Sequence, residues 1–296
     1  MKIGIDLGGT KTESILIDDK GNEIFRKRIQ TEKNYEGTIK GIISLVKEIE
    51  QKFNKVNSIG IGMPGIVSKY TSLVKNANSI WLNGKPLKKD LDSILNKNVN
   101  IENDANCFTL SEAVDGSGKD FNVIFGVIIG TGTGGGLVIN KKIHQGINQI
   151  GGEWGHTSLP NRNDIDKKYA KKCFCGLEGC METYVSGPGF SYIFNNINNE
   201  NFNSHQIIAE FKNETERSKL ALENYVDHLA RGLSNVVNII DPDIIILGGG
   251  MSNVDYICEN INKQLKKYII SDTFHTKVVK NKHGDSSGVR GAAWLS

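Results

Sequence analysis

The chain has 296 residues, of which 38% are hydrophobic and 23% charged, and its formal net charge is +3. This is the composition of an ordinary globular protein, and so small a charge excludes the strongly basic surface that nucleic acids or anionic membranes attract. No apolar run reaches the roughly 18 residues of a membrane helix, and the N-terminal MKIGIDLGG enters a strand pattern without a signal peptide. We therefore expect a cytoplasmic protein with no nucleic-acid or membrane partner.

Two segments of the chain share one pattern. Residues 4–18 read GIDLGGTKTESILID, and residues 126–140 read GVIIGTGTGGGLVIN. Each predicts a strand, a glycine-rich turn and a second strand, which together form an antiparallel hairpin. The exposed backbone N–H groups of such a turn can hold phosphate oxygens, although one such turn alone is equally well a plain tight turn. Two of them, each opening half of the chain, predict a duplicated lobe with phosphates held between.

Between the two hairpins, helix and strand patterns alternate. Apolar residues from Ile39 to Phe53 follow helical spacing. SIGIGM at 58–63 predicts a buried strand that Pro64-Gly65 ends. Residues 99–102 predict a short strand that leads into a helix through Glu112.

The second half predicts a long helix and a further glycine turn. Residues 215–240 have a helical pattern, and a strand at 244–247 runs into three glycines and then a helix from about Ser252. A ligand can approach the backbone closely at such a strand–turn–helix junction. The glycine spacing is not G-x-G-x-x-G, which excludes a Rossmann dinucleotide site. No low-complexity linker separates the two halves, so we expect two lobes that share a cleft.

Eight motifs together resemble the sugar kinases of the ROK family, within the actin-like ATPase superfamily. They are IGIDLGGTKTE at 3–13, GIGMPG at 60–65, NDAN at 103–106, GTGTGGG at 130–136, GEWGH at 152–156, CFCGLEGCMET at 173–183, LGGGMSN at 247–253 and HGDSSGVRGAA at 283–293. The resemblance implies a two-lobed α/β fold of the actin-like ATPase (ribonuclease H-like) type with an interlobe cleft, and a homodimer. We expect a small lobe of residues 1–118 plus 284–296 and a large lobe of residues 119–283.

The resemblance also implies an ATP- and magnesium-dependent hexose kinase. VKNANSIWLNGKPLKKDL at 74–91 and GEWGH are most similar to bacterial fructokinases that also accept mannose. We therefore expect fructose to be converted to its 6-phosphate. The alternatives are a kinase for N-acetylglucosamine or N-acetylmannosamine, a glucokinase, or a sugar sensor. The family's sensors carry an N-terminal DNA-binding module, which has no residues to occupy before the strand expected at Lys2.

Phosphoryl transfer requires shielding of phosphate charge, a metal bridge and a base for the hydroxyl proton. Asp6, a carboxylate at the mouth of the first glycine turn, suits magnesium. The hydroxyl groups in the turns either contact phosphate or only bond within the turns. The residues expected to bind ATP are Gly4, Asp6, Gly8, Gly9, Thr10 and Lys11, then Gly130, Thr131, Gly132, Gly134 and Gly135, and Gly248, Gly249 and Gly250 near the adenosine.

Asp104 is the expected general base. Its place at the end of a strand also suits a helix N-cap, but the NDAN motif matches the catalytic aspartate of the family. We expect Asn103 beside it to hydrogen-bond a sugar hydroxyl. The resemblance implies three further sugar contacts, which are Glu153, His156 and Glu182.

Three of the five cysteines lie in CFCGLEGC at 173–180. Their C-x-C and C-x4-C spacings differ from the C-x-x-C of redox pairs, and an iron–sulfur cluster needs four thiolates. Without a secretion signal a disulfide is not expected either. Three thiolates and one imidazole make a closed structural zinc site, and the family pattern points to His156. The expected ligands are His156, Cys173, Cys175 and Cys180.

Overall fold

The computed structural model describes residues 1–53 and 56–295. These residues form two compact units. Unit 1 comprises Met1–Lys119, Lys141–Ile143 and the residues from Asp285 on, and unit 2 comprises Asp120–Asn140 and His144–Gly284. Each unit has its own sheet and its own hydrophobic core. Among the described residues, no helix has the length and apolar character to span a membrane.

The main sheet of unit 1 has the strand order β3-β2-β1-β4-β7. Its strands are β1 (Lys2–Leu7), β2 (Lys11–Ile17), β3 (Glu23–Gln30), β4 (Ser58–Met63) and β7 (Val99–Asn103), and β5 (Ile66–Val67) pairs with β6 (Val74–Lys75) outside it. β1, β2 and β3 are antiparallel, whereas β4 runs parallel to both β1 and β7. The first predicted hairpin and the predicted buried strand at 58–63 are thus confirmed.

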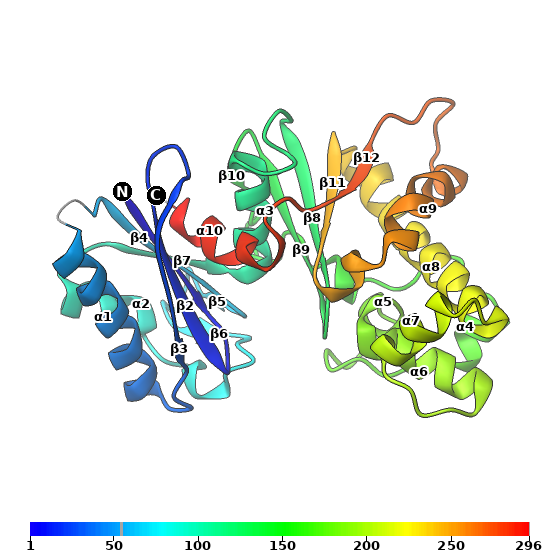
Figure 1. The fold of residues 1–296 in the computed structure, drawn as a ribbon, viewed down its shortest axis with the longest axis horizontal. Helices are drawn as coiled ribbons and strands as arrows, with labels where there is room; N and C mark the ends of the chain where they lie inside the picture. The colour runs from blue at the N-terminus through cyan, green and yellow to red at the C-terminus, as the bar shows by residue number, and fades with distance from the viewer. Residues whose placement is uncertain (54–55, 296) are drawn as a thin grey trace. The chain divides into compact units, whose positions relative to one another are not determined.

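Helices cover both faces of this sheet (Figure 1). They are α1 (Tyr35–Lys52), α2 (Leu87–Leu95), α3 (Asp104–Val114) and α10 (Ser287–Ala293). The Asn34 side chain caps α1 by accepting a hydrogen bond from the backbone N–H of Gly37 at 2.7 Å. The apolar face of α1, including Ile42, Val46 and Ile49, is fully buried in one core with β1 and β4. The helical spacing seen in the sequence therefore describes the packed face.

α10 approaches the strands of unit 1 more closely than side chains would allow. A Cβ atom on Gly4 of β1 would lie 2.1 Å from the Val289 carbonyl oxygen, and one on Gly60 of β4 would lie 1.9 Å from that of Ala292. A Cβ atom on Gly291 of α10 would likewise lie only 1.6 Å from the Cys107 carbonyl oxygen of α3. Only glycine fits at these positions without backbone movement.

The second five-stranded sheet repeats this plan in the order β10-β9-β8-β11-β12, and all of its strands except β10 belong to unit 2. Its strands are β8 (Val123–Ile129), β9 (Thr133–Ile139), β10 (Lys142–Ile143), β11 (Ile244–Gly248) and β12 (Lys277–Lys280). β8 and β9 form the second predicted hairpin, and β11 is parallel to both β8 and β12. The likeness of the two glycine segments thus extends to the topology of the two sheets.

The helices of unit 2 pack around a large core of their own. They are α4 (Asp164–Lys168), α5 (Glu182–Val185), α6 (Gly187–Asn198), α7 (Ser204–Lys212), α8 (Glu216–Ile240) and α9 (Asp255–Leu265). The long helix α8 contacts α9 (Figure 1) and buries Leu229 and Leu233 completely. The helix expected from about Ser252 begins only at Asp255, because a 3-10 turn at Gly250–Asn253 intervenes.

Candidate active site

The first glycine turn lies in unit 1 between β1 and β2. The backbone N–H of Gly8 donates to the Lys11 carbonyl at 3.1 Å. Thr31, just after β3, donates from its backbone to the Thr10 carbonyl at 2.9 Å and from its hydroxyl to the Gly8 carbonyl at 2.8 Å. The buried Thr12 hydroxyl lies 2.8 Å from that of Thr31, so it bonds within the structure. Thr10 and Lys11 are the exposed side chains of the turn.

Asp6 lies half-buried at the penultimate position of β1. Burial, together with the negative charges of Asp104 and Glu13, raises its pKa to about 7, against the opposing effect of Arg28. Negative charge is therefore crowded at this end of the sheet. A hard divalent cation would relieve the crowding, and a carboxylate is the ligand such a cation prefers. Asp6 thus fits a magnesium ligand.

Asp104 is the first residue of α3, and the cap of that helix is Asn103. The Asn103 side-chain oxygen accepts from the backbone N–H groups of Ala105 and Asn106, at 2.9 and 3.4 Å. Asp104 Oδ1 also accepts from Ala105, at 2.8 Å, but the capping geometry is that of Asn103. The N-cap of α3 is therefore Asn103, and not Asp104 as the alternative interpretation had it. Asn103 also donates from Nδ2 to the Gly65 carbonyl at 3.4 Å, and an amide carries a second N–H for a ligand.

Glu102 is a buried carboxylate that the sequence analysis did not select. It is 6% exposed, and its Oε1 accepts from the Asn103 backbone at 2.8 Å and from Asn106 Nδ2 at 3.1 Å. These bonds fix the junction of β7 and α3, where Asp104 lies. In the sequence, Glu102 could have been selected because it is an acidic residue directly before the NDAN motif.

The second glycine turn lies in unit 2 between β8 and β9. The Gly130 N–H donates to the Gly132 carbonyl at 2.9 Å, and the Gly130 carbonyl accepts from the Gly187 N–H at 2.8 Å. At the far end of the turn, the Thr133 N–H donates to Glu182 Oε2 at 3.0 Å. Two hydrogen bonds from the segment around α5 and α6 therefore hold this turn.

Three glycines expected to bind phosphate lie in strands, outside the turns. Gly4 lies under α10, as described above. A Cβ atom on Gly135 would lie 2.7 Å from the Trp154 ring, and the Gly134 carbonyl accepts from Trp154 Nε1 at 3.0 Å. The structure thus places Gly4 and Gly135 where they allow close packing, and Gly134 where its carbonyl binds Trp154.

A cavity of about 700 Å³ opens beside the second turn. Gly130 and Thr131 line it together with Gly250 and Met251 from the 3-10 turn after β11, and α6 and the start of α7 complete its wall. Its volume is in the range of small-molecule and cofactor sites. Gly248 ends β11, and Gly249, with φ of 82°, leaves no room for a side chain beside Ile129. The sequence did not predict that α6 and α7 line a cavity, because their pattern is that of ordinary amphipathic helices.

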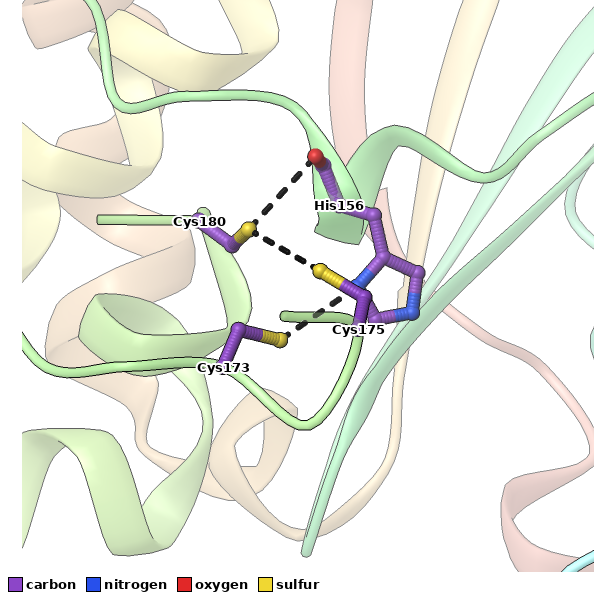
Figure 2. Close-up of side chains that lie close together, drawn as sticks. All are labelled: His156, Cys173, Cys175 and Cys180. Carbon is purple, nitrogen blue, oxygen red and sulfur yellow. Dashed lines mark hydrogen bonds between the residues drawn. The ribbon is translucent and has the colours of Figure 1, made fainter. Parts of the chain in front are cut away.

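The four predicted zinc ligands converge in unit 2 (Figure 2). One ligand atom from each of His156, Cys173, Cys175 and Cys180 lies within 4.8 Å of all the others. The Sγ atoms of Cys175 and Cys180 are 3.6 Å apart, and Cys173 Sγ is 3.5 Å from His156 Nδ1. A tetrahedral zinc with bonds of about 2.0–2.3 Å would separate its ligands by about 3.5–3.8 Å. The donor set and its spacing therefore fit zinc.

The surroundings of the cluster also suit a metal. His156 Nε2, on the far side of the ring from the cluster, lies 4.0 Å from Glu153 Oε2, so a carboxylate faces the ring nitrogen that zinc on Nδ1 would leave free, at a distance beyond a direct hydrogen bond. Burial raises the pKa of the Cys173 and Cys180 thiols, whereas the Leu177 backbone N–H lowers that of Cys175. Because zinc binds thiolates, its binding would release protons from the buried pair.

A buried ion cluster joins residues 156–180, which carry the four predicted zinc ligands and are called the zinc loop below, to α8. Asp166 Oδ1 lies 2.7 Å from His228 Nε2, and Asp166 Oδ2 accepts from Arg231 at 2.9 Å. Burial alone raises the pKa of Asp166, but these partners hold it well below its usual value. Arg231 also donates to the Pro160 and Asn161 carbonyls. No local pattern predicted this cluster, because Asp166 lies 62 and 65 positions from His228 and Arg231.

Comparison with known proteins agrees with this geometry. The model of the ROK family matches residues 2–296. The chain is 38% identical over 301 residues to the N-acetyl-D-glucosamine kinase of Mannheimia succiniciproducens, covering 100% of this chain and 99% of the relative. It is 37% identical to the enzyme of that name from Histophilus somni, covering 100% and 98%. The fold matches the ROK hexokinase of Thermus thermophilus with a TM-score of 0.89 at 24% identity, over 100% and 98% of the two chains.

The fold and these relatives define an ATP-dependent phosphotransferase that acts on sugars. Within that class, the chain belongs to the ROK family of the actin-like ATPase fold. The expectation of a sugar kinase is therefore confirmed, and the sensor alternative is set aside.

The raised pKa of Asp6 predicts a stability effect with a definite sign. Because the folded-state pKa of about 7 exceeds the ordinary 3.8, ionisation opposes folding, and stability is lost as the pH rises through 7. Asp6→Asn should therefore raise the melting temperature of the ligand-free protein by a few degrees at pH 8 and hardly at pH 4. Asp120→Asn, at an exposed carboxylate, is the control and should have no such pH dependence. Equal effects of Asp6→Asn at both pH values would contradict the assignment.

Proposed function

We propose that this enzyme phosphorylates N-acetyl-D-glucosamine with ATP, in preference to the fructose expected from the sequence motifs. The observation that carries the proposal is the match to two kinases of that name along essentially their whole lengths, at 38% and 37% identity. The motifs that suggested fructose cover only a small part of the chain. N-acetylmannosamine and glucose remain alternatives, and the implied homodimer stays a prediction.

The proposed chemistry uses carboxylates from unit 1. Asp104 accepts the proton of the attacking sugar hydroxyl, and Asn103 hydrogen-bonds the sugar. Asp6 holds magnesium, which supplies charge neutralisation at the phosphates. The first glycine turn, with Gly8, Gly9, Thr10 and Lys11, contributes backbone donors and one cation. Support comes from the position of Asp104 at the tip of α3, where Asn103 carries the capping role.

In unit 2 we propose binding sites for nucleotide and sugar. The cavity beside Gly130, Thr131 and Gly250 has room for a nucleotide. Glu153, His156 and Glu182 bind sugar hydroxyls, and zinc on the Cys3His cluster anchors them. The support is that Glu153 lies beside the His156 ring and that Glu182 follows the zinc ligand Cys180 by two residues.

A panel of sugars tests the substrate. ADP release should be measured with fructose, mannose, glucose, N-acetylglucosamine and N-acetylmannosamine at matched concentrations. We expect N-acetylglucosamine to lead, because a few pocket side chains decide such preferences and the relatives at 37–38% identity carry that name. A lead of tenfold or more for fructose would restore the motif-based expectation and reject this proposal.

Substitution of Asp104 tests the base. Asparagine keeps the shape and can accept a hydrogen bond but no proton, so kcat of Asp104→Asn should fall at least about 100-fold. Melting temperature, zinc content and the apparent affinity for sugar should change little, since Asn103 caps the helix. Turnover within a few-fold of the wild type would refute the role of Asp104.

Zinc content tests the metal site. Purified protein should carry about one zinc per chain by elemental analysis. Cys175→Ser should lose the metal, because a hydroxyl is a much poorer zinc ligand, and sugar affinity should fall with it. Cys258→Ser is the matched control, since Cys258 lies outside the cluster. Iron in the cluster, or active protein without metal, would contradict the assignment.

A further inference from the structure

Glu182 lies against the second glycine turn as well as against the zinc cluster. Its Oε2 accepts from the Thr133 N–H at 3.0 Å, and a Cβ atom on Gly132 would lie 2.9 Å from the same oxygen. Its Oε1 lies 3.9 Å from Cys173 Sγ. The Glu182 carboxylate therefore joins the zinc cluster to the second glycine turn, whose Thr133 lies 49 positions earlier in the chain.

The zinc loop and the core of unit 2 together hold this carboxylate in place. α5, which begins at Glu182, is only four residues long and buries Tyr184 and Val185 in that core. The residues on either side are tied to the loop, because the Met181 N–H donates to the Thr157 carbonyl at 2.8 Å and the Thr183 hydroxyl donates to the Cys180 carbonyl at 2.7 Å.

The turn has few other constraints. Gly130 and Gly132 are bonded to each other and Gly130 to Gly187, while Thr131 and Gly132 are exposed. Glycines populate many backbone conformations, and the free turn loses that freedom when a phosphate is bound. A bond at the Thr133 end removes part of this freedom in advance, which favours binding.

We infer that Glu182 is a positioning residue for the nucleotide: through its bond to the Thr133 N–H, the zinc loop holds the second glycine turn in its phosphate-binding conformation. This inference rests on the proposed ATP and zinc sites. It adds to the expected role of Glu182 as a sugar contact, because it predicts an effect on nucleotide binding when no sugar is present.

The test is the dissociation constant of ADP with magnesium, measured by calorimetry without sugar. Glu182→Ala removes the acceptor and should weaken ADP about tenfold, because ADP must then order a turn that the bond had already restricted. Glu182→Gln keeps an oxygen for the Thr133 N–H and should stay within about threefold of the wild type. Glu178→Ala, at an exposed glutamate of the same loop, is the control and should bind ADP as the wild type does.

Two further measurements keep the inference open to rejection. Amide exchange of residues 130–136 in Glu182→Ala should be faster than in the wild type, because the turn loses its bond. If Glu182→Ala does not fold or loses zinc, Glu182→Asp replaces it; its carboxylate is one methylene shorter and should also weaken ADP.

The outcomes separate the two proposals. An Ala or Asp variant that retains zinc and binds ADP within twofold of the wild type overturns the inference, as does a Gln variant as weak as Ala. A wild-type protein that does not bind ADP rejects the proposed nucleotide site itself.

Discussion

The convergence of three thiols and one imidazole is the constraint on which the proposed ligand-binding part of unit 2 depends. Sulfur and nitrogen atoms within 4.8 Å of one another gain little by themselves, since thiolates repel and buried thiols lose solvation. A bound cation would attract the thiolates and so outweigh both their mutual repulsion and their lost solvation. The loop that carries them has little regular structure beyond the five residues of α4. Its shape therefore comes from the cluster and from the Asp166–Arg231 ion pair that fastens it to α8.

In unit 1 the candidate carboxylates Asp6 and Asp104 are positioned by close backbone packing instead of by a metal cluster. Glycines in β1, β4 and α10 bring backbones to distances that no side chain permits, which makes a closely packed base. On this base Asp6 is held near Asp104 and Glu13 at a cost in free energy, as its raised pKa shows. Such a loss of folding stability at one charged residue is common at sites that bind a cation or a substrate.

Local patterns predicted much of this molecule. The hairpins, β4, β7 and α8 follow from alternation, helical spacing and glycine turns, which are properties of neighbouring residues. The zinc set followed from cysteine spacing together with a family motif. Long-range contacts left no such signal. The bond of Thr133 to Glu182 and the pairing of Asp166 with His228 join residues 49 and 62 positions apart. Fructose was expected from short motifs, but the choice among hexoses depends on a few side chains that the motifs do not identify.

The position of α10 has a consequence for synthesis of the chain. Residues 287–293 close the core of unit 1 against β1, β2, β4 and α3, where Val289 and Ala293 pack with Ile15 and Ile17. The ribosome makes these residues only after all of unit 2 up to Gly284. Except for residues 141–143, unit 2 is one continuous segment inserted into unit 1. It can therefore fold during translation as domains do, before α10 exists to cover Gly4 of β1 and Gly60 of β4. The lobe that begins first is completed last, and the nascent chain exposes apolar surface at β1 and β4 for most of its elongation.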